Sequence, residues 1–181
     1  MNRTLVQTSK FVSLALRHDP SAAGLTLDAQ GWADLDALIA GAQAAGVALD
    51  REALAVIMAE SDKARFELSP DASRIRAVHG HSVDVEAHGP AETPPETLWH
   101  GTATRVLDAI LRDGLKPGAR RFVHLSSDAA MARAVGTRHG QPVVLSVAAG
   151  AAHRAGRAFH RSSSGVWLTS AVEPAYLAVA D

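Results

Sequence analysis

The chain of 181 residues is 47% hydrophobic and 20% charged, which is enough for one large domain or two small ones, and no apolar run approaches the length of a membrane span. Cysteine is absent, which excludes disulfides, cysteine-ligated metals and thiol nucleophiles. The net charge is −1, with 8 Lys and Arg against 12 Asp and Glu in residues 1–90 and 10 against 7 in residues 91–181, so the chain lacks the large positive excess of a nonspecific nucleic-acid binder.

The first predicted element is a helix over residues 4–18, with Leu5, Phe11, Leu14 and Ala15 at helical spacing. The pair Asp19-Pro20 ends it, because proline disfavours the α conformation in the residue before it. Arg17 and His18 therefore occupy the last turn, where capping by a cation is the simple structural explanation. Residues 1–4 lack the pattern of an export signal, so we expect a cytoplasmic protein.

The next segments predict three helices followed by a β-hairpin. Residues 24–32 fit a short strand and turn, and Asp34 and Asp50 are candidate N-caps of the second and third helices. Residues 65–68 and 74–78 alternate like strands and are joined by a five-residue turn. This is the order of elements in a winged-helix module.

Two features of this hairpin region bear on function. Arg74 and Arg76 share one strand face, which is either solvated or an anion-binding edge. The run His79-Gly80-His81-Ser82, with His88 nearby, has no further ligand at a metal-motif spacing, so we expect no metal and predict a loop beside the active cleft.

A segment rich in proline and glycine separates the two halves of the chain. We predict a first domain over residues 1–88, a linker over 89–96 and a second domain over 97–181.

The second half predicts a mixed α+β unit in which three strands end in polar tips. The first ends at His100, Gly101 and Thr102, where the glycine would let a ligand approach the backbone. Residues 123–126 and 165–169 repeat this pattern, so three edges are expected to line one pocket.

The remaining elements fill out this unit. A helix capped by Thr104 is expected to bury Val106, Leu107, Ile110 and Leu111 and to end at Gly114, and another begins at the N-cap Asp128. Residues 136–140 form a glycine-flanked loop, and the apolar run 142–147 predicts a central strand buried on both faces. Further strands are expected near residues 157–160 and 176–179.

Several blocks, which occur in one order along nearly the whole chain, resemble the Tpt1/KptA family of NAD-dependent RNA 2'-phosphotransferases. They are Ser9-Lys10-Phe11-Val12-Ser13-Leu14-Ala15-Leu16-Arg17-His18-Asp19-Pro20, Gly31-Trp32, Ile75-Arg76-Ala77-x-x-Gly80-His81-Ser82, His100-Gly101-Thr102, Val123-His124-Leu125-Ser126, Gly136-Thr137-Arg138-His139-Gly140-x-Pro142-Val143-Val144-Leu145 and Gly165-Val166-Trp167-Leu168-Thr169. The resemblance implies an N-terminal winged-helix-like lobe and a C-terminal ADP-ribosyltransferase-like lobe that both contribute to the active site.

The resemblance also implies the reaction and its residues. An internal RNA 2'-phosphate, as at a tRNA splice junction, would pass to NAD+ through an RNA-2'-phospho-ADP-ribose intermediate, giving 2'-OH RNA, nicotinamide and ADP-ribose 1'',2''-cyclic phosphate. The implied catalytic residues are Arg17, His18, Arg76 and Arg138. The implied NAD+-binding residues are His100, Gly101, Thr102, His124, Ser126, Val166 and Trp167. Two positions depart from the family pattern: His79 replaces a usual Gln, and Ser164 replaces a frequent Asn.

The residue types suit this chemistry. A 2'-phosphate with a second pKa near 6 is largely dianionic at neutral pH and can attack without a protein base. Arginines hold such a group by paired hydrogen bonds and stay protonated. The RNA 2'-oxygen is a poor leaving group unless it is protonated in the second step, and His18 is our hypothesis for that general acid.

Two other functions compete with this interpretation. One is an ADP-ribosyltransferase that caps terminal phosphates of RNA or DNA and stops after the first step. The other is a non-enzymatic, NAD-sensing winged-helix nucleic-acid binder, which the acidic N-terminal half disfavours. We expect a monomer that binds RNA and NAD+ and does not associate with a membrane. Arg65, Arg74 and Arg120-Arg121 are candidates for contacts to the flanking RNA backbone.

Overall fold

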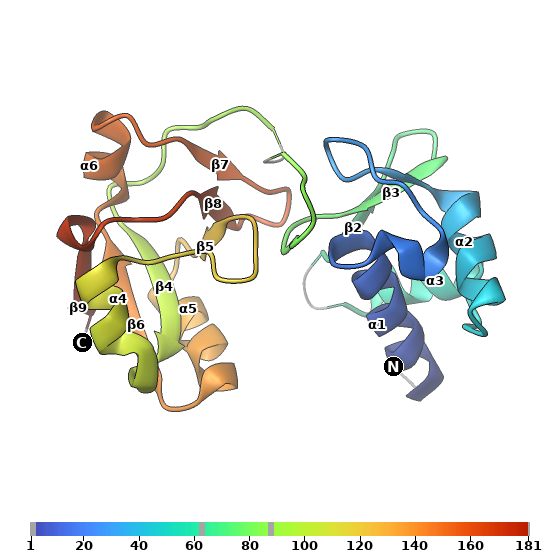
Figure 1. The fold of residues 1–181 in the computed structure, drawn as a ribbon, viewed down its shortest axis with the longest axis horizontal. Helices are drawn as coiled ribbons and strands as arrows, with labels where there is room; N and C mark the ends of the chain where they lie inside the picture. The colour runs from blue at the N-terminus through green and yellow to red at the C-terminus, as the bar shows by residue number, and fades with distance from the viewer. Residues whose placement is uncertain (1–2, 62–63, 87–88, 181) are drawn as a thin grey trace. The chain divides into compact units, whose positions relative to one another are not determined.

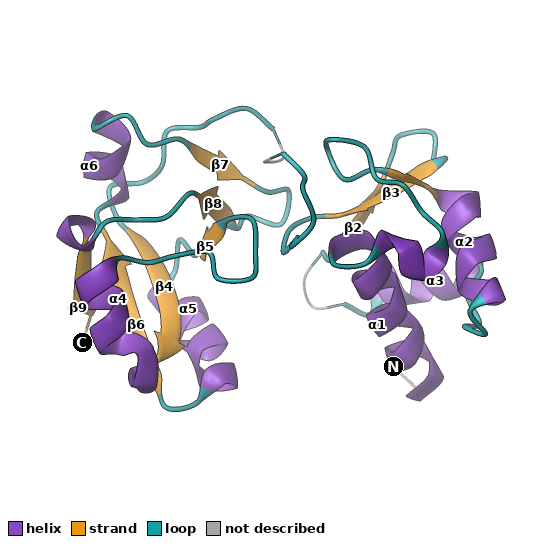
Figure 2. Cartoon of the chain, viewed as in Figure 1, coloured by secondary structure: helices purple, strands orange, loops and turns teal. Residues whose placement is uncertain are grey.

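The computed structural model describes residues 3–61, 64–86 and 89–180. The chain divides into two compact units, Met1–Glu86 and Ala87–Asp181, and each combines helices with small antiparallel sheets (Figures 1 and 2). The predicted α+β class is confirmed at this level. Among the helices in the described ranges, none combines the length and apolarity needed to cross a bilayer.

The first unit begins with α1 (Arg3–Arg17), which ends ahead of a 3-10 turn at Pro20–Ala23. The end before Pro20 confirms the prediction. The buried stripe of α1 was partly mispredicted. Val12, Ala15 and Leu16 are fully buried, whereas Leu14 is 41% exposed and faces away from the core.

Helices α2 (Leu35–Ala44) and α3 (Arg51–Ala59) begin at the predicted N-caps. The Asp34 carboxylate accepts the Ala37 N–H at 2.8 Å, and the Asp50 carboxylate accepts the Ala53 N–H at 2.7 Å. Their inner faces pack against α1 around the fully buried Leu38 and Ile57.

The sheet of the first unit has the order β1-β3-β2, with β1 (Ala33–Asp34), β2 (Phe66–Leu68) and β3 (Arg74–Ala77). The hairpin prediction is confirmed. The turn expected within residues 24–32 is confirmed, since the Asp28 carboxylate accepts the N–H groups of Gln30 and Trp32, both at 2.9 Å. The short strand expected with it is wrong, because these residues pair with no strand.

The second unit holds two three-stranded antiparallel sheets. One has the order β4-β6-β9, with β4 (Leu98–Ala103), β6 (Pro142–Val147) and β9 (Leu177–Ala180). The other has the order β5-β8-β7, with β5 (Val123–Leu125), β7 (Phe159–Arg161) and β8 (Trp167–Thr169). The central position of β6 and the burial of its neighbouring residues Val144 and Leu145 confirm that both of its faces are covered.

The helices of the second unit are α4 (Leu107–Asp113), α5 (Ala129–Gly136) and α6 (Ala149–Arg154). The N-cap Asp128 is confirmed, since its carboxylate accepts the Met131 N–H at 2.7 Å. The Thr104 cap is wrong: the helix begins with a 3-10 turn, Thr104–Val106, that has no side-chain cap. Val106 and Leu111, expected inward, are 38% and 37% exposed. The sequence did not predict α6.

Residues 89–96, the predicted linker, lie against the second unit where they are described. Ala91 forms an isolated antiparallel bridge with His160, and the Glu92 N–H donates to the Phe159 carbonyl at 2.8 Å. This segment therefore extends the edge of β7.

Candidate functional site

The end of α1 carries the first two predicted site residues. The Arg17 guanidinium donates to the Arg65 carbonyl at 3.3 Å and lies over the Phe66 ring, 5.8 Å from its centroid. Gly80, with φ +92°, passes beside the Arg17 side chain, and a Cβ there would lie 3.8 Å from Arg17 Cδ. The loop after β3 therefore packs on Arg17, although more than sixty residues separate the two in sequence.

His18 is exposed next to this loop. Its Nδ1 lies 2.9 Å from Ser82 Oγ. The N–H groups of Ser82 and Val83 both donate to the Arg17 carbonyl, at 2.9 Å and 3.3 Å, and so satisfy a carbonyl at the helix end. Residues 79–82 follow β3 as a loop, as predicted, but the contact of this loop with His18 joins residues too far apart in the sequence to be predicted.

Arg76 is held on the outer face of β3. Its guanidinium stacks on the Trp32 ring at 4.4 Å, its Nε is ion-paired with Glu67, and Nη1 donates to the Gln30 carbonyl at 3.4 Å. The Arg76 and Glu67 side chains are 17% and 23% exposed. The ring face and the ion pair together fix the plane of the guanidinium, which is the pre-organisation that phosphate binding by an arginine requires.

Arg74 shares this face, as predicted, and also lies over Trp32, at 5.9 Å. Its guanidinium pairs with the Asp28 carboxylate at 2.6 Å. Burial opposes ionisation of Asp28, but hydrogen bonds from Trp32, Arg74 and Gln30 together hold its pKa below the usual value. Arg74 and Arg76 are thus each paired with a carboxylate, and Arg76 is the more enclosed of the two, with its side chain 17% exposed against 44% for Arg74.

The NAD+-binding residues implied by the resemblance lie on neighbouring strands of the second unit. Trp99 and Ser126 exchange two backbone hydrogen bonds of 2.8 Å, which join β4 to the end of β5, and Leu125 of β5 pairs with Trp167 of β8. His100 Nδ1 donates to the His124 carbonyl at 3.0 Å, and His124 Nδ1 donates to the Phe122 carbonyl at 2.9 Å. The structure thus brings His100, His124 and Ser126 together.

His100 is half-buried, and burial changes the pKa of its imidazole. Burial lowers its pKa below the ordinary value, the positive charges of Arg120 and His139 lower it further, and the hydrogen bond to the His124 carbonyl opposes both. The imidazole is therefore neutral at pH 7. With its proton on Nδ1, Nε2 carries a lone pair and can accept a hydrogen bond from a hydroxyl group.

A pH dependence of stability follows from this shift. Between the native pKa and about 6.5, the unfolded His100 binds a proton that the native one does not, so the free energy of unfolding falls as the pH is lowered through 6.5. We expect the free energy of unfolding, measured in urea, to fall more between pH 7.5 and pH 5.5 for the native chain than for His100→Gln. Equal losses in the two proteins would contradict the burial-driven shift.

Gly101 has a packing role that the sequence did not predict. A Cβ on Gly101 would lie 1.6 Å from the Ala132 carbonyl oxygen of α5, and one on Gly136 would lie 2.8 Å from the Thr102 carbonyl oxygen. Because the α5 backbone fills the space beside Gly101, as the closeness of α5 to β4 in Figure 1 illustrates, it is this helix that requires the glycine. The approach of a ligand to Gly101 stays a prediction.

Replacing Gly101 by Ala should therefore destabilise the chain. We expect a loss of roughly 3 kcal/mol or more in the free energy of unfolding, because the helix backbone must move to relieve the overlap. Chemical denaturation measures the loss. Gly118→Ala is the matched control: Gly118 has φ +66° and nothing within 4 Å of the added Cβ, so this change carries only the backbone cost of about 1 kcal/mol. Equal losses in both variants would contradict the close packing.

Arg138 lies on a 3-10 turn, Thr137–His139, directly after α5. The Arg105 guanidinium donates to the His139 carbonyl at 2.9 Å and ties this turn to the segment after β4. Since α5 contacts β4 at Gly101 and Gly136, the exposed Arg138 projects from a turn fixed on both sides. Its neighbour His139, together with Arg120, adds positive charge near His100.

The remaining predicted positions are more enclosed. Thr102 and Trp167 are 9% and 5% exposed, and Trp167 belongs to the core of the second unit, with Arg161 over its ring at 5.8 Å. Val166 is half-buried, and its N–H donates to Ser162 Oγ at 3.1 Å. Ser164, one of the two departures from the family pattern, keeps a hydrogen-bonding group in this turn, with its Oγ 3.0 Å from Ser162 Oγ. His79, the other, is half-buried just after β3.

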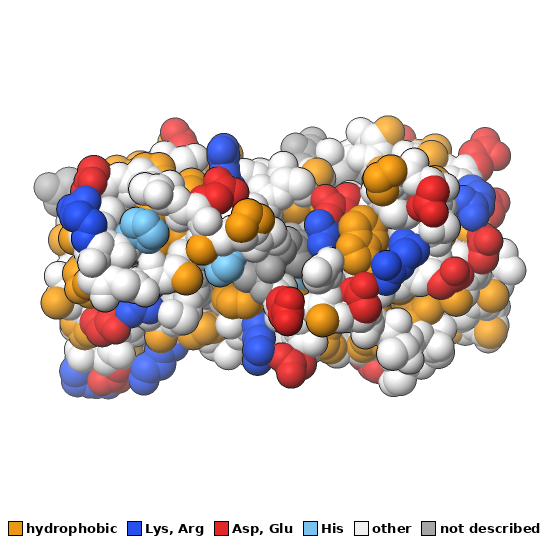
Figure 3. Space-filling model, turned by 90° about the horizontal axis from the view of Figure 1, so that it is seen from above, with side chains coloured by type: hydrophobic (Ala, Val, Ile, Leu, Met, Phe, Trp, Pro, Cys, Tyr) orange, Lys and Arg blue, Asp and Glu red, His pale blue; other side chains and the backbone are white. Residues whose placement is uncertain are grey.

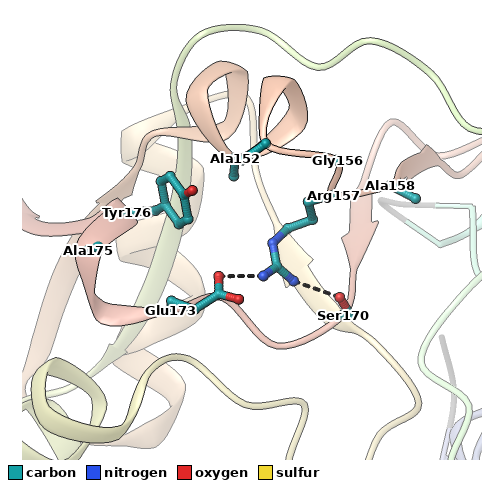
Figure 4. Close-up of a pocket in the computed structure, with 9 residues that line it drawn as sticks. Ala152, Gly156, Arg157, Ala158, Ser170, Glu173, Ala175 and Tyr176 are labelled. Carbon is teal, nitrogen blue, oxygen red and sulfur yellow. Dashed lines mark hydrogen bonds and ion pairs between the residues drawn. The ribbon is translucent and has the colours of Figure 1, made fainter.

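A hollow of about 580 Å³ lies elsewhere on the second unit (Figure 4). Arg157 on its wall pairs with Glu173 and donates to Ser170 Oγ at 2.7 Å. These contacts join Arg157 to the segment that follows β8, and we assign Arg157 to holding this loop. On the face seen in Figure 3, positive and negative side chains are interspersed.

Comparison with known proteins assigns the chain to a family. A family model described as "RNA 2'-phosphotransferase, Tpt1 / KptA family" matches residues 3–171. The chain belongs to this family. In this Tpt1/KptA member, the matched range contains Arg17, His18, Arg76 and Arg138, while β9 lies beyond it.

Relatives of this Tpt1/KptA chain cover nearly its full length. A "Probable RNA 2'-phosphotransferase" of Agrobacterium fabrum is 55% identical over 172 residues, which are 95% of this chain and 92% of the relative. Proteins of the same name from Hahella chejuensis and Pseudomonas aeruginosa are 51% and 54% identical; the first covers 100% of this chain and 97% of its own length, the second 94% of each.

Proposed function

We propose that this chain is an NAD+-dependent RNA 2'-phosphotransferase that moves an internal 2'-phosphate from RNA to NAD+. The observation that carries the proposal is the family match over residues 3–171, which spans the arginines and the histidine named above. Arg17 and His18 adjoin at one helix end, and Arg76 is held between Glu67 and Trp32. These side chains offer the planar, permanently charged donors that a phosphate dianion requires.

In the proposed first step, a phosphate oxygen attacks C1'' of the nicotinamide ribose. The C1''–N bond breaks, its electron pair returns to the pyridinium ring, and neutral nicotinamide leaves. Arg17, Arg76 and Arg138 orient the dianion and shield its charge, and no protein base is needed at neutral pH. The product is an RNA-2'-phospho-ADP-ribose intermediate.

In the proposed second step, the 2''-hydroxyl of the ADP-ribose attacks phosphorus. The bond from phosphorus to the RNA 2'-oxygen breaks, His18 donates a proton to that oxygen, and the proton of the 2''-hydroxyl passes to solvent. The products are a 2'-hydroxyl on RNA and ADP-ribose 1'',2''-cyclic phosphate.

The dinucleotide would bind the second unit at the β4–β5 edge. The neutral His100 offers an acceptor at Nε2, and Thr102 and Ser126 offer hydroxyl groups on adjoining strands, a set that suits ribose hydroxyls. Trp167, which is 5% exposed, would contribute little surface. We propose an ADP-ribosyltransferase-like fold for this unit, and a winged-helix-like fold for the first unit because α1, α2 and α3 precede its β2–β3 hairpin.

The test supplies NAD+ and two oligonucleotides, one with a single internal 2'-phosphate and one with only a 5'-phosphate. We expect the 2'-phosphate to be lost and nicotinamide to be released. A stable adduct on the 5'-phosphorylated oligonucleotide, with the 2'-phosphate left intact, would instead favour the terminal-phosphate ADP-ribosyltransferase.

A further inference from the structure

The loop that follows β3 closes the C-terminal end of α1 in two ways. Its backbone closes the helix, since the N–H groups of Ser82 and Val83 both donate to the Arg17 carbonyl. The Ser82 side chain of this loop contacts His18, the residue that follows α1: Ser82 Oγ lies 2.9 Å from His18 Nδ1 and 3.4 Å from the Arg17 carbonyl oxygen. The two contributions are chemically separable, because only the second needs the serine hydroxyl.

The proton positions of this contact depend on where the Ser82 hydroxyl directs its one hydrogen. A carbonyl oxygen accepts only, so in the 3.4 Å contact with the Arg17 carbonyl the Ser82 hydroxyl is the donor. With its hydrogen directed there, Ser82 Oγ accepts from His18 and the imidazole proton is on Nδ1. A charged imidazole carries a hydrogen on both ring nitrogens, so its Nδ1–H also donates to Ser82 Oγ, and Nε2 is the nitrogen that does not face Ser82. In this arrangement the contact fixes one orientation of the charged ring, the form that can act as an acid.

We propose that Ser82 is a positioning residue for His18, holding Nδ1 so that Nε2 carries the proton given to the RNA 2'-oxygen. The proposal rests on the proposed function. It gives the hydroxyl of the loop at residues 80–83 a part in the second step: the P–O2' bond breaks as the proton leaves His18 Nε2 for the 2'-oxygen, while Nδ1–H stays bonded to Ser82 Oγ. The first step needs no proton and should not depend on Ser82.

The first experiment measures the tautomer without any reaction. Imidazole ¹⁵N chemical shifts of the full chain at pH 8 should show His18 protonated at Nδ1, and Ser82→Ala should shift the population toward the Nε2–H form. Ser82→Thr keeps a hydroxyl on Cβ and should restore the native shifts. An unchanged His18 tautomer in Ser82→Ala would overturn the proposal.

The second experiment separates the two chemical steps in single turnovers with a 2'-phosphorylated RNA and NAD+. Ser82→Ala should slow decay of the intermediate about tenfold, the equivalent of one hydrogen bond to a charged group, and leave nicotinamide release unchanged. Ser82→Thr should recover most of this rate. The matched control is Ser61→Ala, which removes another serine hydroxyl of the first unit, one that donates to the Ile57 carbonyl at 2.7 Å, and should change neither step.

The outcomes distinguish this proposal from the proposed function. If His18→Ala stalls the second step but Ser82→Ala does not, or if Ser82→Ala slows both steps equally, the positioning role of Ser82 is wrong. If the native chain transfers no 2'-phosphate, the proposed function is wrong, and with it the part of Ser82 in the second step; the tautomer measurement then still decides whether Ser82 holds His18.

Discussion

His18→Ala is expected to release nicotinamide at close to the native rate and then to accumulate the RNA-2'-phospho-ADP-ribose intermediate. The reason is that a phosphate dianion is already a competent nucleophile, whereas the RNA 2'-oxygen leaves poorly unless it is protonated. Loss of a general acid costs about 10² to 10⁴ in rate, so the second step should fall by that factor. Rapid chemical quench with labelled RNA measures both steps.

The position of His18 supports its assignment to the second step. Its side chain is exposed at the end of α1, so RNA can reach it, and Ser82 fixes one ring nitrogen. A matched control is His153→Ala, because His153 is not among the candidate residues and its Nδ1 donates to the Arg157 carbonyl at 3.1 Å. Slow nicotinamide release without accumulation of the intermediate in His18→Ala would contradict the assignment.

Arg138→Lys is expected to lose activity although it keeps the positive charge. Lysine is a point charge on a flexible stem and cannot reproduce the planar, two-pronged contact of arginine with phosphate oxygens. Because Arg138 projects from a turn fixed by Arg105 and by the contact of α5 with β4, the neighbouring backbone has little freedom to adapt. We expect nicotinamide release to slow by about 10² to 10³, the effect of losing one preorganised donor set.

The matched control for this prediction is Arg112→Lys. Arg112 is an exposed arginine of α4 in the same unit, paired with Asp113 at 2.8 Å. This control should retain native rates and stability. Equal activity of Arg138→Lys and the native chain would show that charge alone is used at this position, and the geometric role given to Arg138 would be wrong.

The sequence predicted the helices of the first unit because its signals there are local. Asp34 and Asp50 are N-caps and Pro20 is a helix stop, and each acts within a few residues. In the segment after β4 the local signal was misleading, because Val106 of the 3-10 turn and Leu111 of α4 suit a buried helix face but are exposed. Which face of a short helix is covered depends on tertiary packing.

The partners of the candidate residues were not predictable in the same way. A five-residue turn closed by Leu68 and Arg74 would set Glu67 opposite Ile75. Instead, the Ser69 N–H donates to the Arg74 carbonyl at 3.0 Å, so the register pairs Glu67 with Arg76. A shift of one residue therefore decides which side chain faces the carboxylate.

Long-range contacts account for the rest. Ser82 meets His18 across 64 positions of sequence, and Gly101 meets α5 about thirty residues later. Residue type and spacing indicated that these positions matter, through their place in the family blocks. They did not indicate that Gly101 makes room for a helix or that the Ser82 hydroxyl contacts the His18 ring.

In the proposed reaction a phosphate leaves the 2'-position of RNA and joins ADP-ribose. Labelling that phosphate alone with ³²P and incubating the RNA with the full chain and NAD+ follows this transfer. We expect the label to move to ADP-ribose 1'',2''-cyclic phosphate in step with nicotinamide release, leaving unlabelled RNA with a 2'-hydroxyl. Label that stays on the RNA, or that appears as free phosphate without nicotinamide, would contradict it.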